Sequence, residues 1–169
     1  IPALDSAGKL FEQGKIFLPQ LIQTASVAQA AFEVIKTTLI ERNAAPVSRG
    51  EIVLATVKGD IHDIGKNIVR VLLENYGYTV LDLGRDVPCQ LVADTAKEHG
   101  VKLVGLSALM TTTLGAMEET IQLVKQSCPD CKIVVGGAVL TADYAEKIGA
   151  DFYAKDAMET VAVAKEVVG

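Results

Sequence analysis

The feature that most constrains the fold is a series of short apolar runs separated by longer stretches with helical periodicity. The first run covers residues 52–57, and similar runs follow at 80–83, 103–106, 133–135 and, more weakly, 151–154. Strands that are apolar on both faces are typical of a parallel sheet covered by helices on both sides. We therefore predict an α/β domain with a doubly wound, five-stranded parallel sheet.

The stretches between and after these runs carry apolar residues at helical spacing. Helices are expected at residues 64–76, 90–99, 114–126, 142–148 and 157–168. Strands that alternate with helices of this length indicate right-handed crossovers. Residues 51–169 are therefore expected to form one domain.

The first forty residues have a different pattern, with helical periodicity and no strand-like run. Gly14 and Pro19 interrupt the periodicity, which predicts two helices joined between them. Two helices rarely form an independent domain, so residues 1–43 are expected to pack on another unit. Residues 44–50 lose the periodicity and contain Pro46 and Gly50, which indicates a linker.

The bulk properties exclude several classes of function. The formal net charge of −5 argues against a general nucleic-acid binder, which needs a basic face. No apolar run approaches the length of a membrane span, so no membrane association is expected. The three cysteines, an odd number, suit a reducing compartment, and we expect a cytoplasmic protein. Cys128 and Cys131 form a CxxC pair without a second pair, and we expect them to be incidental surface thiols.

Polar and small residues gather where the expected strands end. Residues 58–67 follow the first strand, residues 107–113 follow the third, and Gly136 and Gly137 follow the fourth. In an open parallel sheet, ligands bind outside the carboxyl ends of the strands. This edge of the sheet is therefore the expected site.

The loop after the first strand does not fit three common templates. A dinucleotide fingerprint requires GxGxxG, whereas this loop has only Gly59 and Gly65. A P-loop requires four residues between its glycines and then Lys-Ser or Lys-Thr, but here there are five, followed by Lys66 and Asn67. A response regulator would carry an aspartate after the third strand, where Ser107 stands. Lys66 itself is expected to be solvated.

The remaining candidate in this loop is His62, with Asp60 two residues before it and Asp63 directly after it. In an extended loop, residues i and i+2 face the same way, so Asp60 can contact one imidazole nitrogen. Such a carboxylate orients a ligating histidine and makes it more basic. The other histidine, His99, lies far along the chain, and no zinc cluster is indicated. A single histidine ligand suits a metal whose other positions are filled by a macrocycle.

Three short motifs carry a resemblance to a known family. DIHDIG at residues 60–65 is followed after 41 residues by SAL at 107–109, and after 26 more by GG at 136–137. This spacing resembles the signature of cobalamin-binding domains, which have a Rossmann- or flavodoxin-like fold. The segment KGDIHDIGKNIV most closely resembles the cobalamin-binding region of cobalamin-dependent methionine synthase, and it is similar to that of corrinoid methyl-carrier proteins.

The resemblance implies cobalamin, in the form of methylcobalamin, as the cofactor. His62 would be the lower axial ligand of cobalt, with Asp60 bonded to it. Thr113 stands where the family usually has a serine, and its hydroxyl would be the partner of Asp60. The other loop residues that the resemblance assigns to cofactor binding are Gly59, Ile61, Asp63 and Gly65.

The resemblance also assigns residues to the nucleotide tail of the cofactor. Ser107 and Leu109 would line a deep pocket that receives the displaced dimethylbenzimidazole. Gly136 and Gly137 would let the tail pass close to the backbone. Further contacts with the corrin or its tail are implied for Thr111, Tyr153 and Ala157.

Residues 11–21 (FEQGKIFLPQL) resemble the helical cap that covers the upper face of the corrin in methionine synthase. Phe11, Leu18 and Leu21 would shield that face. Only about the second half of the family's four-helix cap is present, and core packing is an alternative role for Phe11 and Leu18.

The function that the resemblance implies is methyl transfer through cobalt. The first interpretation is the cobalamin module of methionine synthase, whose partners bind methyltetrahydrofolate and homocysteine, together with a partner for reductive activation. The alternatives are a stand-alone corrinoid protein for methanol, methylamine or O-demethylation systems and a cobalamin-dependent sensor module. A mutase subunit is a fourth possibility, against which the cap argues.

Overall fold

The computed structural model of the chain describes residues 2–41 and 48–169. Its centre is a 5-stranded parallel sheet with the strand order β2-β1-β3-β4-β5. The strands are β1 (Glu51–Thr56), β2 (Thr79–Asp82), β3 (Leu103–Ser107), β4 (Lys132–Gly136) and β5 (Phe152–Tyr153). The predicted doubly wound sheet is confirmed, and this strand order is the flavodoxin-like one.

The expected helices are all present in the α/β part and differ from the predicted bounds by one residue at their ends. They are α3 (Ile64–Asn75), α4 (Cys89–His99), α5 (Leu114–Ser127), α6 (Ala142–Lys147) and α7 (Ala157–Val167). A short 3₁₀ helix, η1 (Thr111–Thr113), precedes α5 where the sequence indicated only a loop. Differences of this size at helix ends are ordinary.

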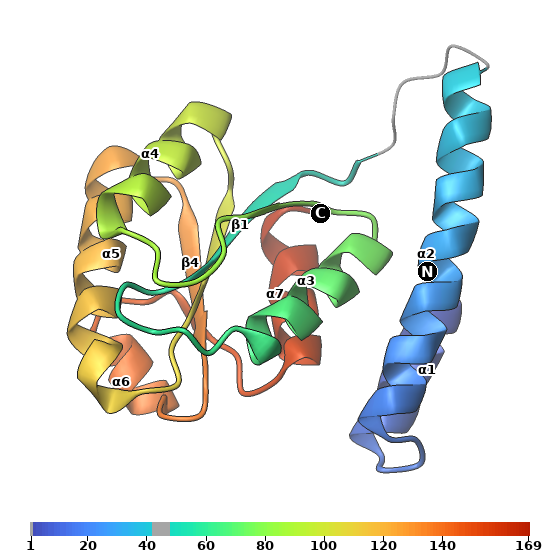
Figure 1. Cartoon of the computed structure of the whole chain (residues 1–169), viewed down its shortest axis with the longest axis horizontal. Coiled ribbons are helices and arrows are strands. Elements are labelled where there is room, and N and C mark those ends of the chain that lie inside the picture. The colour runs from blue at the N-terminus through green and yellow to red at the C-terminus, as the bar shows by residue number, and fades with distance from the viewer. Residues whose placement is uncertain (1, 42–47) are drawn as a thin grey trace.

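The helices cover both faces of the sheet (Figure 1). Strand β1 shows why both faces are apolar, because its side chains alternate between two cores. Val53 and Ala55 face a core shared with α4, α5 and α6, whereas Ile52 and Leu54 face a core shared with α3 and α7. We call these the closed face and the cavity face of the sheet.

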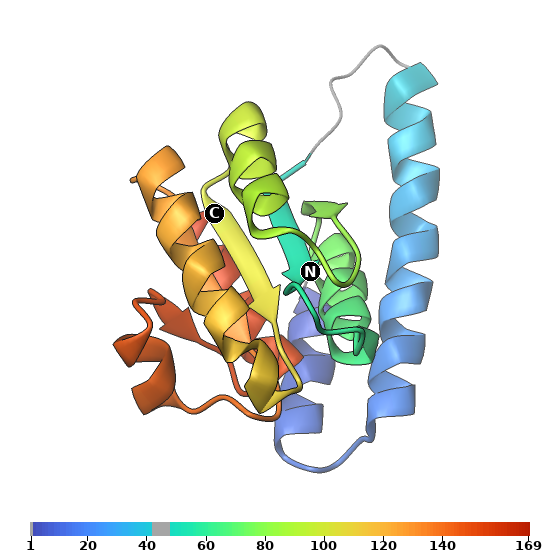
Figure 2. The same cartoon turned by 60° about the vertical axis from the view of Figure 1, so that its left-hand side comes forward.

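The N-terminal residues form two helices, α1 (Pro2–Glu12) and α2 (Leu18–Glu41), that lie outside α3 and α7 (Figures 1 and 2). Ala7, Leu21 and Ala25 are buried in the core of the cavity face. Pro19, expected in the connection, instead lies in the first turn of α2. Proline is tolerated there because its missing N–H would have no partner within the helix. We call α1 and α2 the helical pair.

Two further findings concern residues with expected surface or linker roles. Residues 44–47 of the linker expected at 44–50 lie outside the described residues, so the predicted domain boundaries of 1–43 and 51–169 stay predictions. The expectation of surface thiols is wrong for Cys131, which is buried in the core of the closed face. Burial raises the pKa of its thiol to about 12. Cys128 is half-buried, and both cysteines are free.

Across residues 2–41 and 48–169, no helix is both long and apolar enough to cross a bilayer.

Candidate functional site

The site lies at the edge of the sheet where the connections that follow two neighbouring strands leave toward opposite faces. Strands β1 and β3 are adjacent, but β1 leads into α3 on the cavity face and β3 leads into α5 on the closed face. The loops that follow these strands therefore part at the carboxyl edge of the sheet, which is where ligands bind in such folds. His62 lies in the first of these loops, and Leu109 and Met110 lie in the second.

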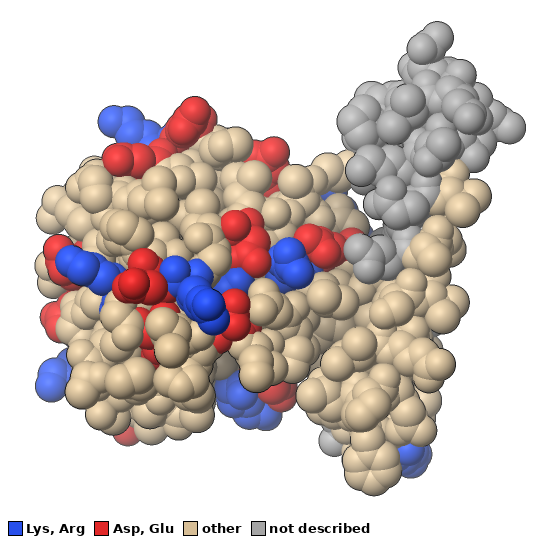
Figure 3. All heavy atoms as spheres, in the orientation of Figure 1, with Lys and Arg blue, Asp and Glu red and all other residues tan. Residues whose placement is uncertain are grey.

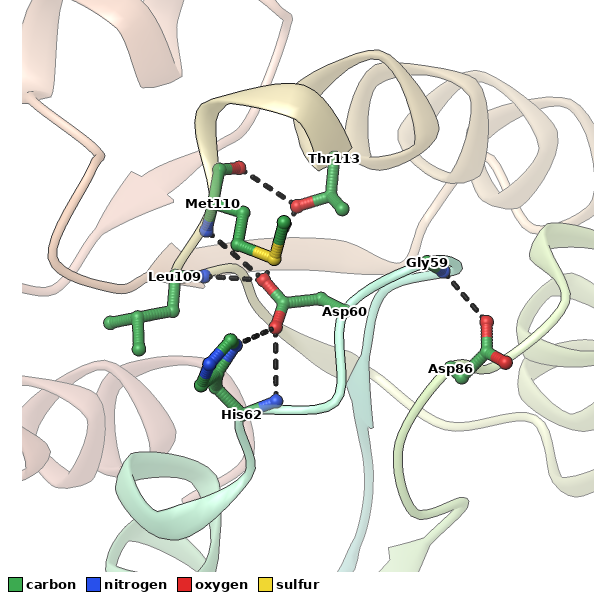
Figure 4. A network of polar contacts seen from close by, with 7 residues as sticks. All are labelled: Gly59, Asp60, His62, Asp86, Leu109, Met110 and Thr113. Atoms are coloured by element: carbon green, nitrogen blue, oxygen red, sulfur yellow. Dashed lines mark hydrogen bonds and ion pairs between the residues drawn. The ribbon is translucent and has the colours of Figure 1, made fainter.

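Asp60 is the centre of the polar network at this edge, and its side chain is fully buried (Figure 4). Its Oδ1 accepts a hydrogen bond from the backbone N–H of His62 at 3.0 Å and lies 2.8 Å from His62 Nδ1. Its Oδ2 accepts from the backbone N–H groups of Leu109 at 2.6 Å and Met110 at 3.1 Å. The hydroxyl of Thr113 lies 3.2 Å from the same oxygen. The expected contact between Asp60 and the imidazole is therefore present.

These contacts keep the carboxylate of Asp60 ionised. Burial alone would raise its pKa, but the N–H of His62 and then that of Leu109, the His62 ring and the N–H of Met110 lower the pKa to about 2. An ionised carboxylate at Nδ1 favours the tautomer that carries its proton on this nitrogen. The Nε2 of His62 is then left with a free lone pair. Because the His62 side chain is 47% exposed, an incoming metal can reach it.

Thr113 has a divided role in this network. Its hydroxyl lies 2.8 Å from the carbonyl oxygen of Met110 as well as 3.2 Å from Asp60 Oδ2. A hydroxyl has one proton to donate, so the two acceptors compete for it. Thr113 is buried and well placed to support Asp60, but the two backbone N–H groups provide the steadier contacts.

Apolar side chains flank His62 and remain exposed. Ile61 is 60% exposed and Ile64 is 79% exposed, and on the neighbouring loop Leu109 is 42% exposed. Large apolar side chains clustered beside one polar group are typical of a ligand-binding surface. The arrangement suits a flat, largely apolar ligand with a metal that His62 can reach.

A cavity of about 460 Å³ lies beside this surface, between the cavity face of the sheet and helices α3 and α7. This volume is within the range for small-molecule sites. Leu54, Gly105 and Val134 form part of its wall. The predicted site residues that line it are Gly65, Ser107, Gly136, Gly137, Tyr153 and Ala157, together with Phe11, Leu18 and Leu21 from the helical pair.

Several predicted residues are placed elsewhere. Leu109, expected in the deep pocket, lies outside the cavity with its side chain exposed, and it serves the site through its backbone N–H. Thr111 is exposed in η1 and lies outside the cavity. Gly59, Ile61 and Asp63 belong to the His62 loop rather than to the cavity wall.

The close approach of neighbouring backbone explains why two glycines follow β4. Gly137 has φ +138°, and a Cβ there would overlap the carbonyl oxygen of Ala108. A Cβ on Gly136 would lie 3.0 Å from the carbonyl oxygen of Ala154. The glycines therefore let neighbouring loops approach each other, and the same approach shapes the mouth of the cavity.

The expectation that Lys66 is solvated is wrong. Its side chain is buried against the cavity, and its ammonium pairs with the carboxylate of Asp82 at the end of β2. Asn67 Oδ1 lies 3.3 Å from the same ammonium. A buried lysine requires such a partner. The sequence signal is weak, because Asp82 lies 16 positions after Lys66 on a different element.

Gly105 is a further residue that the sequence reasoning missed. It interrupts an apolar strand, and a Cβ there would overlap Leu54 Cδ2. A glycine inside a strand often marks a close approach to a backbone or ligand, and this signal was available.

Cobalamin fits these observations. Within the described residues, no group of three or more His, Cys, Asp or Glu could hold a metal ion. A metal at this edge therefore needs a carrier that supplies its remaining ligands, as a corrin does. The apolar surface around His62 and the adjacent cavity provide room for a ring and an appended tail.

Comparison with known families identifies the two parts of the chain. Residues 50–162 match the B12 binding domain family. Residues 1–36 match a second family that is also described as a B12 binding domain.

Related proteins have the same cofactor class in their names. Dimethylamine corrinoid protein 1 of Methanosarcina acetivorans is 44% identical over 167 residues, which are 98% of this chain and 78% of that protein. Trimethylamine corrinoid protein 1 of Methanosarcina mazei is 41% identical over 164 residues, which are 96% of this chain and 76% of that protein.

Solved structures agree with this relationship. A cobalamin-binding protein from Desulfitobacterium hafniense is 36% identical with a TM-score of 0.84, and the match covers 98% of this chain and 78% of that one. The methanol:cobalamin methyltransferase complex MtaBC of Methanosarcina barkeri matches at 31% identity and TM-score 0.84, covering 98% and 63%. The chain therefore belongs to the B12-binding domain family, as a corrinoid protein whose cofactor is cobalamin.

Proposed function

We propose that this corrinoid protein carries a methyl group on cobalt within a methyltransferase system that uses a methylated amine or methanol. The observation that carries the proposal is the geometry of His62, whose Nδ1 faces the ionised Asp60 while its ring is 47% exposed beside an apolar surface. This geometry supports His62 as the lower ligand of cobalt. Bound cobalamin supplies a metal that can accept a methyl group from one partner and pass it to another.

In this proposal the residues around His62 control the proton at Nδ1. Asp60 accepts that proton's hydrogen bond and fixes the ring, so that His62 would hold a bound cobalt through Nε2. Thr113 supports Asp60 from the other side.

The cavity is the proposed site of the cofactor's dimethylbenzimidazole tail. Its wall is mainly apolar, which suits an aromatic base, and Ser107 offers a hydroxyl at the end of β3. Gly136, Gly137, Tyr153 and Ala157 also line the cavity. Gly65 opens the start of α3 to the same space, because nothing lies within 4 Å of a Cβ placed on it.

The helical pair is the proposed cover of the upper corrin face. Phe11, Leu18 and Leu21 line the cavity in this structure, so the pair rests against the binding region. Shielding a methyl group above the ring would require the pair to shift once the ring is in place. The predicted linker at 44–50 would be the hinge of that movement.

The comparisons favour a stand-alone corrinoid carrier over the first interpretation, methionine synthase. The similar proteins bear the names of dimethylamine and trimethylamine corrinoid proteins, and one similar structure is a complex with a methanol methyltransferase. The expected folate- and homocysteine-binding partners receive no such support. The proposed partner is therefore a methyltransferase subunit that presents its methylated substrate to the cobalt.

Electron paramagnetic resonance of the Co(II) protein tests the role of His62. With ¹⁵N-histidine labelling, the nitrogen superhyperfine triplets should become doublets. The chain has two histidines, so the matched control is His99→Gln. This variant should keep the doublets, whereas His62→Gln should lose them. A pattern that labelling leaves unchanged would show that no protein histidine binds the cobalt and would refute the proposal.

A second experiment tests the methyl source. The cobalamin-loaded, reduced protein is mixed separately with methyltransferases for dimethylamine, trimethylamine and methanol, and methylation of cobalt is followed by visible absorption. One of these should methylate the protein faster than methyltetrahydrofolate with a folate-dependent methyltransferase does. Efficient methylation only from methyltetrahydrofolate would instead support methionine synthase.

A further inference from the structure

The loop between β2 and α4 (residues 83–88) runs along the base of the His62 loop. The N–H of Thr56 donates to the carbonyl oxygen of Gly84 at 2.9 Å, and the N–H of Val87 donates to that of Thr56 at 3.1 Å. Val57 and Val87 form an isolated parallel bridge. The pairing of β1 and β2 thus continues beyond their ends and brings residues 83–88 to the site.

The start of this loop is also fixed from the side of α3. Asp82 accepts a hydrogen bond from the N–H of Gly84 at 2.9 Å. The same carboxylate pairs with the buried ammonium of Lys66. The loop is therefore held by β1 along its length and by α3 at its origin, which makes it a firm support for what it contacts.

Asp86 connects this loop to the residues just before His62. Its Oδ1 accepts a hydrogen bond from the N–H of Gly59 at 2.7 Å, as Figure 4 shows. Its own N–H donates to the carbonyl oxygen of Asp60 at 2.9 Å. Two bonds from one residue thus fix the peptide groups on both sides of the Gly59–Asp60 bond.

The backbone of Asp86 is unusual. Its φ is +53°, and no other non-glycine residue in the described part of the chain has a positive φ. The side chain is exposed, so packing does not explain an aspartate there. Glycine would adopt this conformation more readily. The carboxylate bond to Gly59 is the feature that glycine would lack.

We propose that Asp86 is a positioning residue for the cobalt ligand, acting through the backbone of Gly59 and Asp60. The two bonds set the direction in which the Asp60 side chain leaves the loop. That direction decides whether Oδ1 meets His62 while Oδ2 meets Leu109 and Met110. Asp86 touches neither the ring nor the cavity. The inference rests on the proposed role of His62.

The positive φ allows a clean experiment. Asp86→Gly removes the carboxylate and relieves the backbone, so it should not destabilise the fold. Asp86→Asn keeps an oxygen acceptor and tolerates the left-handed region. Asp86→Ala removes the acceptor and keeps a Cβ. Arg85→Ala, at an exposed neighbour in the same loop, is the control for general loop effects.

Each variant is loaded with cobalamin, and the ratio of histidine-coordinated to uncoordinated Co(II) is measured from the ¹⁵N-histidine resonance pattern. Thermal unfolding of the cofactor-free protein is recorded in parallel. Asp86→Gly and Asp86→Ala should lower the ratio about tenfold, the effect of losing one hydrogen bond to a charged group. Arg85→Ala should match the unmodified protein, and Asp86→Asn, which keeps a neutral acceptor, should lose less than the other two Asp86 variants. Cobalamin affinity should fall by no more than this ratio does, since the cavity is intact.

Three results would overturn the proposal. The first is an unchanged ratio in Asp86→Gly, and the second is an equal loss in Asp86→Asn. The third is failure of both Asp86→Gly and Asp86→Ala to fold while Asp86→Asn folds, which would make the acceptor a requirement of folding. The resonance pattern of the unmodified protein distinguishes failure of this proposal from failure of the function proposed above. If it shows no histidine pattern, the role of His62 fails; if it does and Asp86→Gly matches it, only the role of Asp86 fails.

Discussion

The two faces of the sheet are built from the same strands but serve different ends. On the closed face, Met117, Ile121 and Val124 of α5 are fully buried against side chains of β3 and β4. On the cavity face, α3 and α7 leave a space of about 460 Å³. Both faces are apolar, so hydropathy alone does not distinguish them. The difference lies in side-chain size at a few positions.

Gly105 shows how the cavity arises. Within β3, Val104 and Leu106 face the closed side and fill it. Leu103 and Gly105 face the other side, where the glycine contributes no side chain. Leu54 takes the place of the missing side chain, and the cavity that both residues line reaches Ser107 and Gly136 at the carboxyl edge. The closed face thus supplies packing that stabilises the domain, whereas the cavity face is less densely packed and can admit a ligand.

The largest expected effect tests the closed face. Ile121→Ala should lower the free energy of unfolding by about 3 kcal/mol, because it leaves a void in a packed core. Cobalamin affinity should stay within twofold, since Ile121 lies on the side away from the cavity. Urea unfolding and titration calorimetry measure the two quantities. Gln122→Ala, at an exposed position on the same helix, is the control. A large loss of affinity in Ile121→Ala would show that the faces are not independent.

The next prediction tests the cavity face. Gly105→Ala places a Cβ against Leu54 Cδ2, which moves Leu54 toward the cavity. Cobalamin binding should weaken about tenfold, with a loss of about 1 kcal/mol in stability, as for mild overpacking. Gly115→Ala is the matched control, because nothing lies within 4 Å of a Cβ there. It should leave binding unchanged. Equal affinities in a folded Gly105→Ala would mean that the cavity does not receive the tail.

A third prediction concerns the carboxyl edge that the two faces share. In the cofactor-free protein, Asp60→Asn should lower the free energy of unfolding by about 2 kcal/mol at pH 7, because it replaces a charged acceptor of backbone N–H groups. The pKa of Asp60 is lowered on folding from 3.8 to about 2. Its contribution is therefore fully present above pH 4 and is lost as the pH falls toward 2. Urea unfolding of both proteins as a function of pH measures this.

The control for this pH series is Asp63→Asn. The side chain of Asp63 makes no capping hydrogen bond at the start of α3, so its removal should have little effect at any pH. If the free energies of unfolding of Asp60→Asn and the unmodified protein instead differ by the same amount at pH 7 and pH 2.5, the carboxylate charge does not stabilise this edge.

The sequence was sufficient for the architecture because both faces of the sheet leave a strong pattern. Strands buried on two sides appear as continuous apolar runs, and the helices between them keep their own period. Local exceptions escaped this reasoning. The break in periodicity at Pro19 predicts a connection, but a helix tolerates proline in its first turn, and the threonines at 111–113 give no sign of the 3₁₀ helix.

The strand pattern predicts which loops meet at the site, but individual contacts there are predictable only between residues that are close in sequence. Asp60 and His62 are two positions apart, and their contact follows from an extended loop. The partners of Lys66 and Gly59 are Asp82 and Asp86, and these pairs depend on how β2 lies beside β1. The loop after β2 carries no histidine or glycine motif, so nothing directed attention to it. Contacts of this kind require the strand order, which a single sequence does not state.

The smallest expected effect is chemical and returns to the closed face. Iodoacetamide at pH 8 should alkylate the half-buried Cys128 well before Cys131 in the folded protein. Burial raises the pKa of Cys131 to about 12, so only about one part in ten thousand of it is thiolate at that pH. Tandem mass spectrometry distinguishes the two sites, and in urea both should react. Because Cys131 lies in the core of the closed face, its alkylation at the rate of Cys128 under native conditions would show that this face opens readily, and the contrast between a packed face and a ligand-admitting face would not hold.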